Sequence, residues 1–196
     1  ISTVISAFNS LTLSPALSAL LLQGHGARKD FITRLLEKAL GSHPGVATLE
    51  EVDVLAGAGA GLLDSQAGLF RLQTLDASQA AAYRRAYWTA AAEALGTGAQ
   101  GRVVVDKMPL HTLALPLIAK LFPDAQILFA LRDPRDVVLS CFRRRFQMNS
   151  AMYEFLTLER AAAYYDAVMR LAGRYREILP LRLREVRHEA VVADFD

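Results

Sequence analysis

The stretch QILFALRDPRDVVLS, residues 126–140, decides the fold class of this chain. Its first six residues are almost all apolar, which is typical of a strand buried on both faces of a parallel sheet. Arg132 ends the apolar run, and Pro134 and Asp136 suit the first turn of a helix. Such a sheet binds ligands at the carboxyl ends of its strands, where a guanidinium can hold a phosphate through two parallel hydrogen bonds. The stretch therefore predicts an anion site at Arg132, and an ion pair with a neighbouring aspartate is the alternative.

The rest of the chain repeats this alternation of strand and helix. Short apolar or alternating runs predict strands at residues 16–23, 102–106 and 181–187. Apolar residues at helical spacing predict helices at residues 31–40, 77–95, 111–121, 136–146 and 156–178. We therefore expect an α/β fold with three layers, a mostly parallel sheet flanked by helices, in a single domain over residues 1–196. Within it, residues 1–15 are expected to be a leader segment and residues 53–75 a variable loop region.

Composition narrows the function classes. The chain has 196 residues, 53% of them hydrophobic, which is enough to build a core without disulfides or metals. Because the formal net charge is only +2, no bulk attraction to nucleic acid is expected. The apolar segment at residues 11–23 is interrupted by Pro15 and is too short to span a bilayer. It also does not resemble a signal peptide, because no basic residue precedes it. We expect a cytoplasmic segment of a longer protein, with its one cysteine, Cys141, packed as a small side chain.

Two further predicted strand ends carry groups that bind anions. Residues 24–29 follow the first predicted strand, and glycines such as Gly26 let backbone amides approach a ligand, although the spacing is not that of a Walker loop. Lys107 follows the strand at 102–106, and Pro109 fixes the backbone beside it. An ordinary turn and a solvated lysine are the simpler interpretations of each feature alone. Three such strand ends together favour a ligand with two or more phosphate-like groups.

An acidic pair, Glu50 and Glu51, lies on a segment that could return over the same edge of the sheet. A surface acid at the start of a helix through residues 52–55 is the simpler interpretation. With cations nearby, a carboxylate can instead act as the base for an acceptor hydroxyl. The four histidines are scattered without cysteine or acidic partners at metal-ligand spacing, so no metal site is expected.

Five motifs, in this order and at these separations, resemble the sulfotransferases that use PAPS (3′-phosphoadenosine 5′-phosphosulfate), in particular the bacterial and tyrosylprotein-type branch. The motifs are GSHP at residues 41–44 followed by Glu51, DKMP at 106–109, LFPDA at 121–125, LRDPRD at 131–136 with Ser140, and EILP at 177–180. The resemblance covers roughly residues 19–194 and is strongest from Val103 onwards. It implies a fold like that of P-loop NTPases.

The resemblance also implies roles for individual residues. In such enzymes an arginine at a strand end and a serine on the following helix hold the 3′-phosphate of the nucleotide, which implies that Arg132 and Ser140 bind the cofactor. Lys107 corresponds to a catalytic lysine that assists at the sulfuryl group, and Glu51 to the proposed catalytic base. These roles imply metal-free sulfuryl transfer from PAPS to a hydroxyl acceptor, which is a protein tyrosine, a carbohydrate or a small phenol. The oligomeric state is left open.

The chain departs from the family pattern at the loop that holds the 5′-phosphosulfate. Family members carry PRSGTT after the first strand, whereas this chain has HGARKDFIT at residues 25–33. With an insertion allowed, Arg28 or Lys29 takes the cationic role and Thr33 the hydroxyl role in cofactor binding, beside the backbone of Gly26. The altered loop supports one alternative, a catalytically silent nucleotide-binding or scaffolding module of the same fold. A P-loop-like kinase is disfavoured because the Gly-Lys-Ser/Thr sequence is missing.

Overall fold

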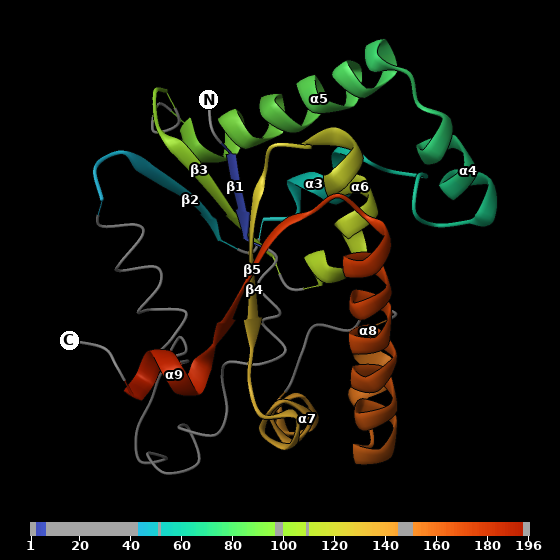
Figure 1. Cartoon of the computed structure of the whole chain (residues 1–196), viewed down its shortest axis with the longest axis vertical. Helices are drawn as coiled ribbons and strands as arrows, with labels where there is room; N and C mark the ends of the chain where they lie inside the picture. Colours follow the sequence, from blue (N-terminus) through green and yellow to red (C-terminus); the bar gives the residue numbers. More distant parts are fainter. Residues whose placement is uncertain are drawn as a thin grey trace.

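The sheet of this protein is parallel throughout the part of the chain that the structure describes. The structure is a computed structural model, and it describes residues 3–6, 43–50, 52–96, 100–108, 110–144 and 151–193. Five strands in these residues pair in the order β2-β3-β1-β4-β5 (Figure 1). Their bounds are β1 Thr3–Ser6, β2 Val46–Glu50, β3 Val103–Lys107, β4 Gln126–Leu131 and β5 Arg182–Arg187.

Helices connect and flank these strands. The α-helices are α3 Val54–Ala58, α4 Gln66–Thr74, α5 Ala77–Leu95, α6 Leu115–Leu121, α7 Pro134–Arg143, α8 Leu158–Ile178 and α9 His188–Ala193, and the 3₁₀-helices are η3 His111–Ala114 and η4 Met152–Phe155. The start of α5 is fixed by a capping box between Asp76 and Gln79, and Pro134 suits the first turn of α7. Figure 1 shows α7 and α9 beyond the arrowheads of β4 and β5, at the carboxyl edge of the sheet.

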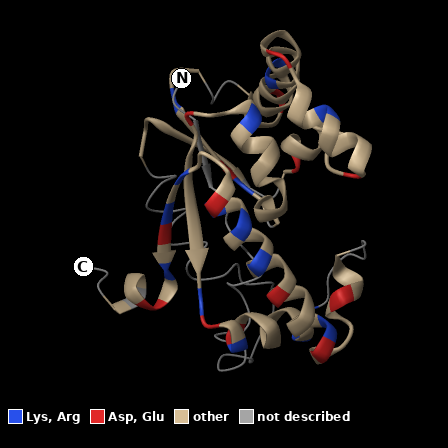
Figure 2. Ribbon diagram, turned by 45° about the vertical axis from the view of Figure 1, so that its right-hand side comes forward, with Lys and Arg blue, Asp and Glu red and all other residues tan. Residues whose placement is uncertain are grey.

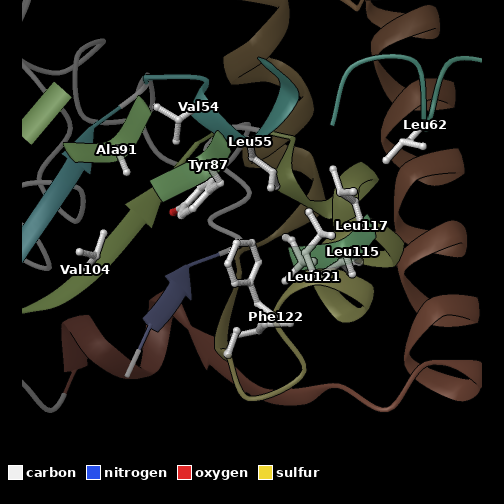
Figure 3. Packing of buried hydrophobic residues seen from close by; sticks show 14 of the residues in the cluster. Val54, Leu55, Leu62, Tyr87, Ala91, Val104, Leu115, Leu117, Leu121 and Phe122 are labelled. Atoms are coloured by element: carbon white, nitrogen blue, oxygen red, sulfur yellow. The ribbon is translucent and has the colours of Figure 1, made fainter. Parts of the chain in front are cut away.

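The main core lies where α5 and α6 pack against the sheet. Tyr87 of α5 is fully buried, and its ring meets Trp88 and Phe122 edge to face at centroid distances of 5.1 and 4.9 Å. Figure 3 shows these apolar side chains gathered between α5, α6 and β3. The core also buries the apolar face of α6, which contributes Leu115, Leu117, Ile118 and Leu121. Burial on this scale fixes α5 against the sheet, because each such side chain contributes about 1.5–3 kcal/mol.

The structure confirms the predicted fold class, an α/β domain with parallel strands flanked by helices. The helix predicted at residues 77–95 is α5. The helix predicted at 136–146 is α7, which begins two residues earlier and ends three residues earlier, and the helix predicted at 156–178 is α8, which begins two residues later. The helix predicted at 111–121 is divided into η3 and α6. The predicted strands 102–106 and 181–187 are β3 and β5, each shifted by one residue at its start.

Two strands were missed by the sequence analysis. Thr3–Ser6, within the residues 1–15 for which no strand was predicted, pairs with both β3 and β4 in the middle of the sheet. Val46–Glu50 forms β2 at the edge of the sheet, although no strand was predicted there. Both strands are shorter than six residues, and their pairing partners lie far away in sequence, so local periodicity gives little indication of them. The strand predicted at 16–23 and the helix at 31–40 lie outside the described residues.

Candidate functional site

The carboxyl edge of the sheet brings together residues that are far apart in the chain. Lys107, the last residue of β3, lies in register with Ser6 of β1 and with Glu50 of β2. These three strands therefore end at one level. Glu50 is a strand residue rather than the first residue of a helix, because α3 begins only at Val54 and is capped by the side chain of Asp53.

The strands β4 and β5 continue past this level. Ile5 pairs with Ile127 and also with Asp106, so β4 extends beyond the level of Lys107 for three more residues, to Leu131. At about 3.3 Å per residue, this extension adds about 10 Å. Leu131 pairs with Arg187, which places the next residues, Arg132 and His188, side by side at the far end. We call the level of Lys107 the low part of the edge, and the level of Arg132, which lies further along the strand direction, the high part.

Arg132 lies at the high part, beside the first turns of α7. The residue is only 8% exposed, and its Nη2 donates a hydrogen bond of 3.0 Å to Oδ2 of Asp136. Ser140, also buried, follows Asp136 by four residues and so lies on the same face of α7. The ion pair that the sequence analysis named as an alternative is therefore present. A guanidinium has five N–H donors and can therefore bind a carboxylate and a phosphate together, and the carboxylate of Asp136 is half-exposed.

The residues next to Arg132 connect α9 to the start of α7. The backbone N–H of Asp133 donates to Oε1 of Glu189 at 2.9 Å, and the side chain of Asp133 accepts from the backbone N–H of Arg135 at 2.9 Å. The hydrogen bonds from Arg135 hold the pKa of Asp133 well below its usual range. Burial, together with the positive charge of Arg132, lowers the pKa of His188. In Figure 2 both basic and acidic residues occur at the end of β4 and along α8.

Lys107 lies at the low part of the edge and is 7% exposed. Its neighbour Asp106 is fully buried and accepts a hydrogen bond from the hydroxyl of Tyr87, with 3.0 Å between Oη and Oδ2. The other carboxyl oxygen of Asp106 lies 4.0 Å from Nδ1 of His111. Burial raises the pKa of Asp106 to about 7, and the negative charge of Asp53 adds to this shift, whereas the hydrogen bond from Tyr87 opposes it. Asp106 lies in the DKMP motif at residues 106–109, but no role was predicted for it from the sequence.

The structure does not place every predicted site residue. Glu51, Gly26, Arg28, Lys29 and Thr33 lie outside the described residues, so their roles stay predictions. The residues that the structure brings to the carboxyl edge are Lys107 and Arg132, with Ser140 on the adjoining helix.

Cys141, next to Ser140, is buried, as expected for a packed small side chain. Burial raises the pKa of its thiol to about 12, so the thiolate is scarce at neutral pH. None of the described helices is both long enough and apolar enough to cross a bilayer. The described residues also contain no group of three or more His, Cys, Asp or Glu side chains arranged to hold a metal ion.

Comparison with known proteins identifies the family. The model of the sulfotransferase family matches residues 33–196. The chain belongs to the sulfotransferase family. A crystal structure of a sulfotransferase from Alicyclobacillus acidocaldarius is similar to this chain, with 18% sequence identity and a TM-score of 0.48 over 83% of this chain and 70% of that one. No curated protein matches the sequence.

Proposed function

We propose that this sulfotransferase-family protein moves a sulfuryl group from PAPS to a hydroxyl acceptor by in-line transfer. The observation that carries the proposal is the pair of buried basic residues at one edge of a parallel sheet, Lys107 and Arg132. Four residues of strand rise and two strand spacings separate them, which corresponds to about 16 Å between their Cα atoms. Their long side chains can shorten the distance between the charged groups.

PAPS fits this arrangement because it has two anionic ends. Arg132 and the hydroxyl of Ser140 would hold the 3′-phosphate, since a guanidinium matches phosphate geometry and a hydroxyl can donate to a phosphate oxygen. Lys107 would face the 5′-phosphosulfate, where a compact ammonium can follow the charge as it moves. Gly26, Arg28, Lys29 and Thr33 are proposed to complete the binding of this second end.

The transfer step needs positioning and neutralisation of charge. The acceptor oxygen attacks the sulfur atom, and the bond between that sulfur and the bridging oxygen of the 5′-phosphate breaks. Glu51 would accept the proton of the attacking hydroxyl, and Lys107 would stabilise the negative charge that collects on the leaving phosphate. We propose that side chains supply all the positive charge, without a metal ion.

The register of β2 supports the role of Glu51. Glu50 is level with Lys107 on the neighbouring strand. Glu51 is the next residue of the chain, and we propose that its carboxylate reaches the space beside the lysine. A base in this position would lie on the acceptor side of the sulfuryl group, provided that the nucleotide extends from Arg132 towards Lys107. The acceptor is proposed to be a protein tyrosine, a carbohydrate hydroxyl or a small phenol.

The proposal is tested by calorimetry with adenosine 3′,5′-bisphosphate, the spent donor, followed by transfer assays with PAPS and a panel of phenols and sugars. Arg132→Ala should weaken binding at least 30-fold, which is about 2 kcal/mol, because a buried charge pair is broken. The matched control is Arg135→Ala, since Arg135 lies three residues away with a side chain that is 90% exposed. Binding that is the same in both variants would refute the assignment of the nucleotide site.

The transfer assay distinguishes an active sulfotransferase from an inactive protein of the same fold. Sulfate transfer to any hydroxyl acceptor by the wild type, lost in Lys107→Ala, supports the proposal. Binding of the bisphosphate without transfer to any acceptor would instead support the silent module. Tighter binding of ATP with magnesium would favour a kinase.

A further inference from the structure

Asp106 is a fully buried carboxyl group one residue before the proposed catalytic lysine. Its two oxygens face different elements: Oδ2 accepts from the hydroxyl of Tyr87 on α5, and Oδ1 lies 4.0 Å from Nδ1 of His111 at the start of η3. A buried carboxyl group is costly unless hydrogen bonds satisfy it, so its presence in a strand of valines needs an explanation. Asp106 has no part in the transfer step described above.

Of the two elements that face Asp106, η3 follows Lys107 closely in the chain, beginning at His111. Between Asp106 and His111 the chain makes a tight turn, in which the backbone N–H of His111 donates to the carbonyl of Met108 and Leu110 has a φ of 66°. A positive φ is unfavourable for a residue with a bulky side chain. The turn persists because packing and polar contacts at its ends favour it, and Asp106 is at one of these ends.

Tyr87 provides a rigid anchor for this carboxyl group. Its ring is fully buried and is held edge to face by Trp88 and Phe122, so its hydroxyl has little freedom to move. Figure 3 shows the ring within the core, with its oxygen at the side of β3. The hydrogen bond between Tyr87 and Asp106 therefore connects the end of β3 to the aromatic side chains of the main core.

We infer that Asp106 is a positioning residue, which Tyr87 and His111 hold so that the end of β3 presents Lys107 to the donor. This inference rests on the proposed function of Lys107. Successive residues of a strand point to opposite faces, so an anchor at Asp106 on the α5 side opposes rotation of the strand end while the side chain of Lys107 leaves the other face. A lysine has four rotatable bonds in its side chain, and fixing the backbone beneath it reduces the volume that its ammonium explores.

Protonation of Asp106 changes the contacts of this anchor. The polar groups around the carboxyl are Tyr87 from α5, His111 from η3 and Asp53 at the start of α3, while the paired strands place Leu49 and Ile5 beside it. The ionised carboxylate only accepts hydrogen bonds, from Tyr87 at Oδ2, whereas the neutral acid gains an O–H donor close to Nδ1 of His111. The position of Lys107 should therefore depend on pH around neutrality.

Tyr87→Phe tests the anchor without changing the shape of the core. Tyr83→Phe is the matched control, because Tyr83 lies one turn earlier on the same helix and packs against the same core from a half-buried position. In the free protein, hydrogen-exchange protection of the Lys107 and Met108 amides should fall at least 10-fold in Tyr87→Phe and stay unchanged in Tyr83→Phe. Equal protection at these two amides in both variants would overturn the inference.

The kinetic test separates positioning from simple loss of stability. In Tyr87→Phe, kcat should fall by about 10- to 100-fold, the scale expected when a catalytic group is misplaced. Binding of adenosine 3′-monophosphate, which tests Arg132 and Ser140 but not Lys107, should change less than threefold. A parallel loss of this binding would indicate general unfolding and would contradict a positioning role.

Asp106→Asn supplies the pH profile. Asparagine keeps an oxygen that can accept from Tyr87 but does not titrate, so the dependence of kcat on pH near neutrality should become flatter than in the wild type. An unchanged profile would contradict the inference. If the wild type transfers no sulfate, the proposed function fails, and exchange protection of Lys107 in the free protein, compared between the wild type and Asp106→Asn across pH 5–8, decides about the anchor by itself.

Discussion

Asparagine at position 106 should remove a pH dependence of stability that the buried carboxyl group creates. The pKa of Asp106 is raised from an ordinary value of 3.8 to about 7, chiefly by burial. Because the folded state holds the proton more tightly than the unfolded state, this group's contribution to stability is fully present below pH 4. It is lost as the pH rises towards 7. A shift of about 3 units corresponds to about 4 kcal/mol, at about 1.4 kcal/mol per unit.

The assay is urea unfolding of the wild type and Asp106→Asn at a series of pH values from 4.5 to 8. The free energy of unfolding of the variant, minus that of the wild type, should increase across this window by about 3 kcal/mol, because part of the effect is already lost at pH 4.5. Asp166→Asn is the matched control, because Asp166 is an exposed carboxylate on α8 in a pair with Arg170 and should give a small, nearly flat difference. A flat difference for Asp106→Asn would refute the reasoning, since it would mean that burial does not hold the proton on this group.

Two further predictions concern packing. Gly68→Ala should destabilise the protein by about 1–3 kcal/mol, because a Cβ at this position would lie 2.4 Å from the backbone oxygen of Gly61. The control Gly57→Ala meets no atom within 4 Å and should be neutral or stabilising. Urea midpoints of the two variants check this prediction, and equal midpoints would contradict it. Cys141 should react with a thiol reagent at pH 8 at least 100-fold more slowly in the folded protein than in urea, because burial raises its pKa to about 12. Equal rates would contradict this prediction, since they would mean that the reagent reaches the thiol in the folded protein.

The sequence was most informative where a long apolar run met a turn with strong preferences. β4 and α7 could be predicted from residues 126–143, since an apolar strand ending at Arg132 is followed by Pro134 and Asp136, which suit the first turn of a helix. The long helix α5 was predicted from apolar residues at helical spacing. Arg132 was assigned to a strand end for the same reason, and the register of β4 with β5 confirms that position.

The remaining features depend on contacts between distant parts of the chain. β1 is a four-residue strand whose place in the middle of the sheet comes from pairing with β3 and β4, more than 90 residues later in the chain. Glu50 was expected near a helix start because nothing local distinguishes the five residues of β2 from a loop. The proposed role of Asp106 could not be predicted from the sequence for a related reason. Only the packing of α5 brings the hydroxyl of Tyr87, 19 residues earlier, to its carboxyl group.

The measurement that tests the proposal most directly is a cross of two variants with two half-ligands. Calorimetry would compare Arg132→Ala and Lys107→Ala in their binding of adenosine 3′-monophosphate and adenosine 5′-monophosphate. We predict that Arg132→Ala weakens only the 3′-monophosphate and Lys107→Ala only the 5′-monophosphate, each by at least 10-fold, while both variants weaken adenosine 3′,5′-bisphosphate. If either variant leaves the bisphosphate affinity unchanged, the two basic residues do not share one nucleotide, and the proposed site is wrong.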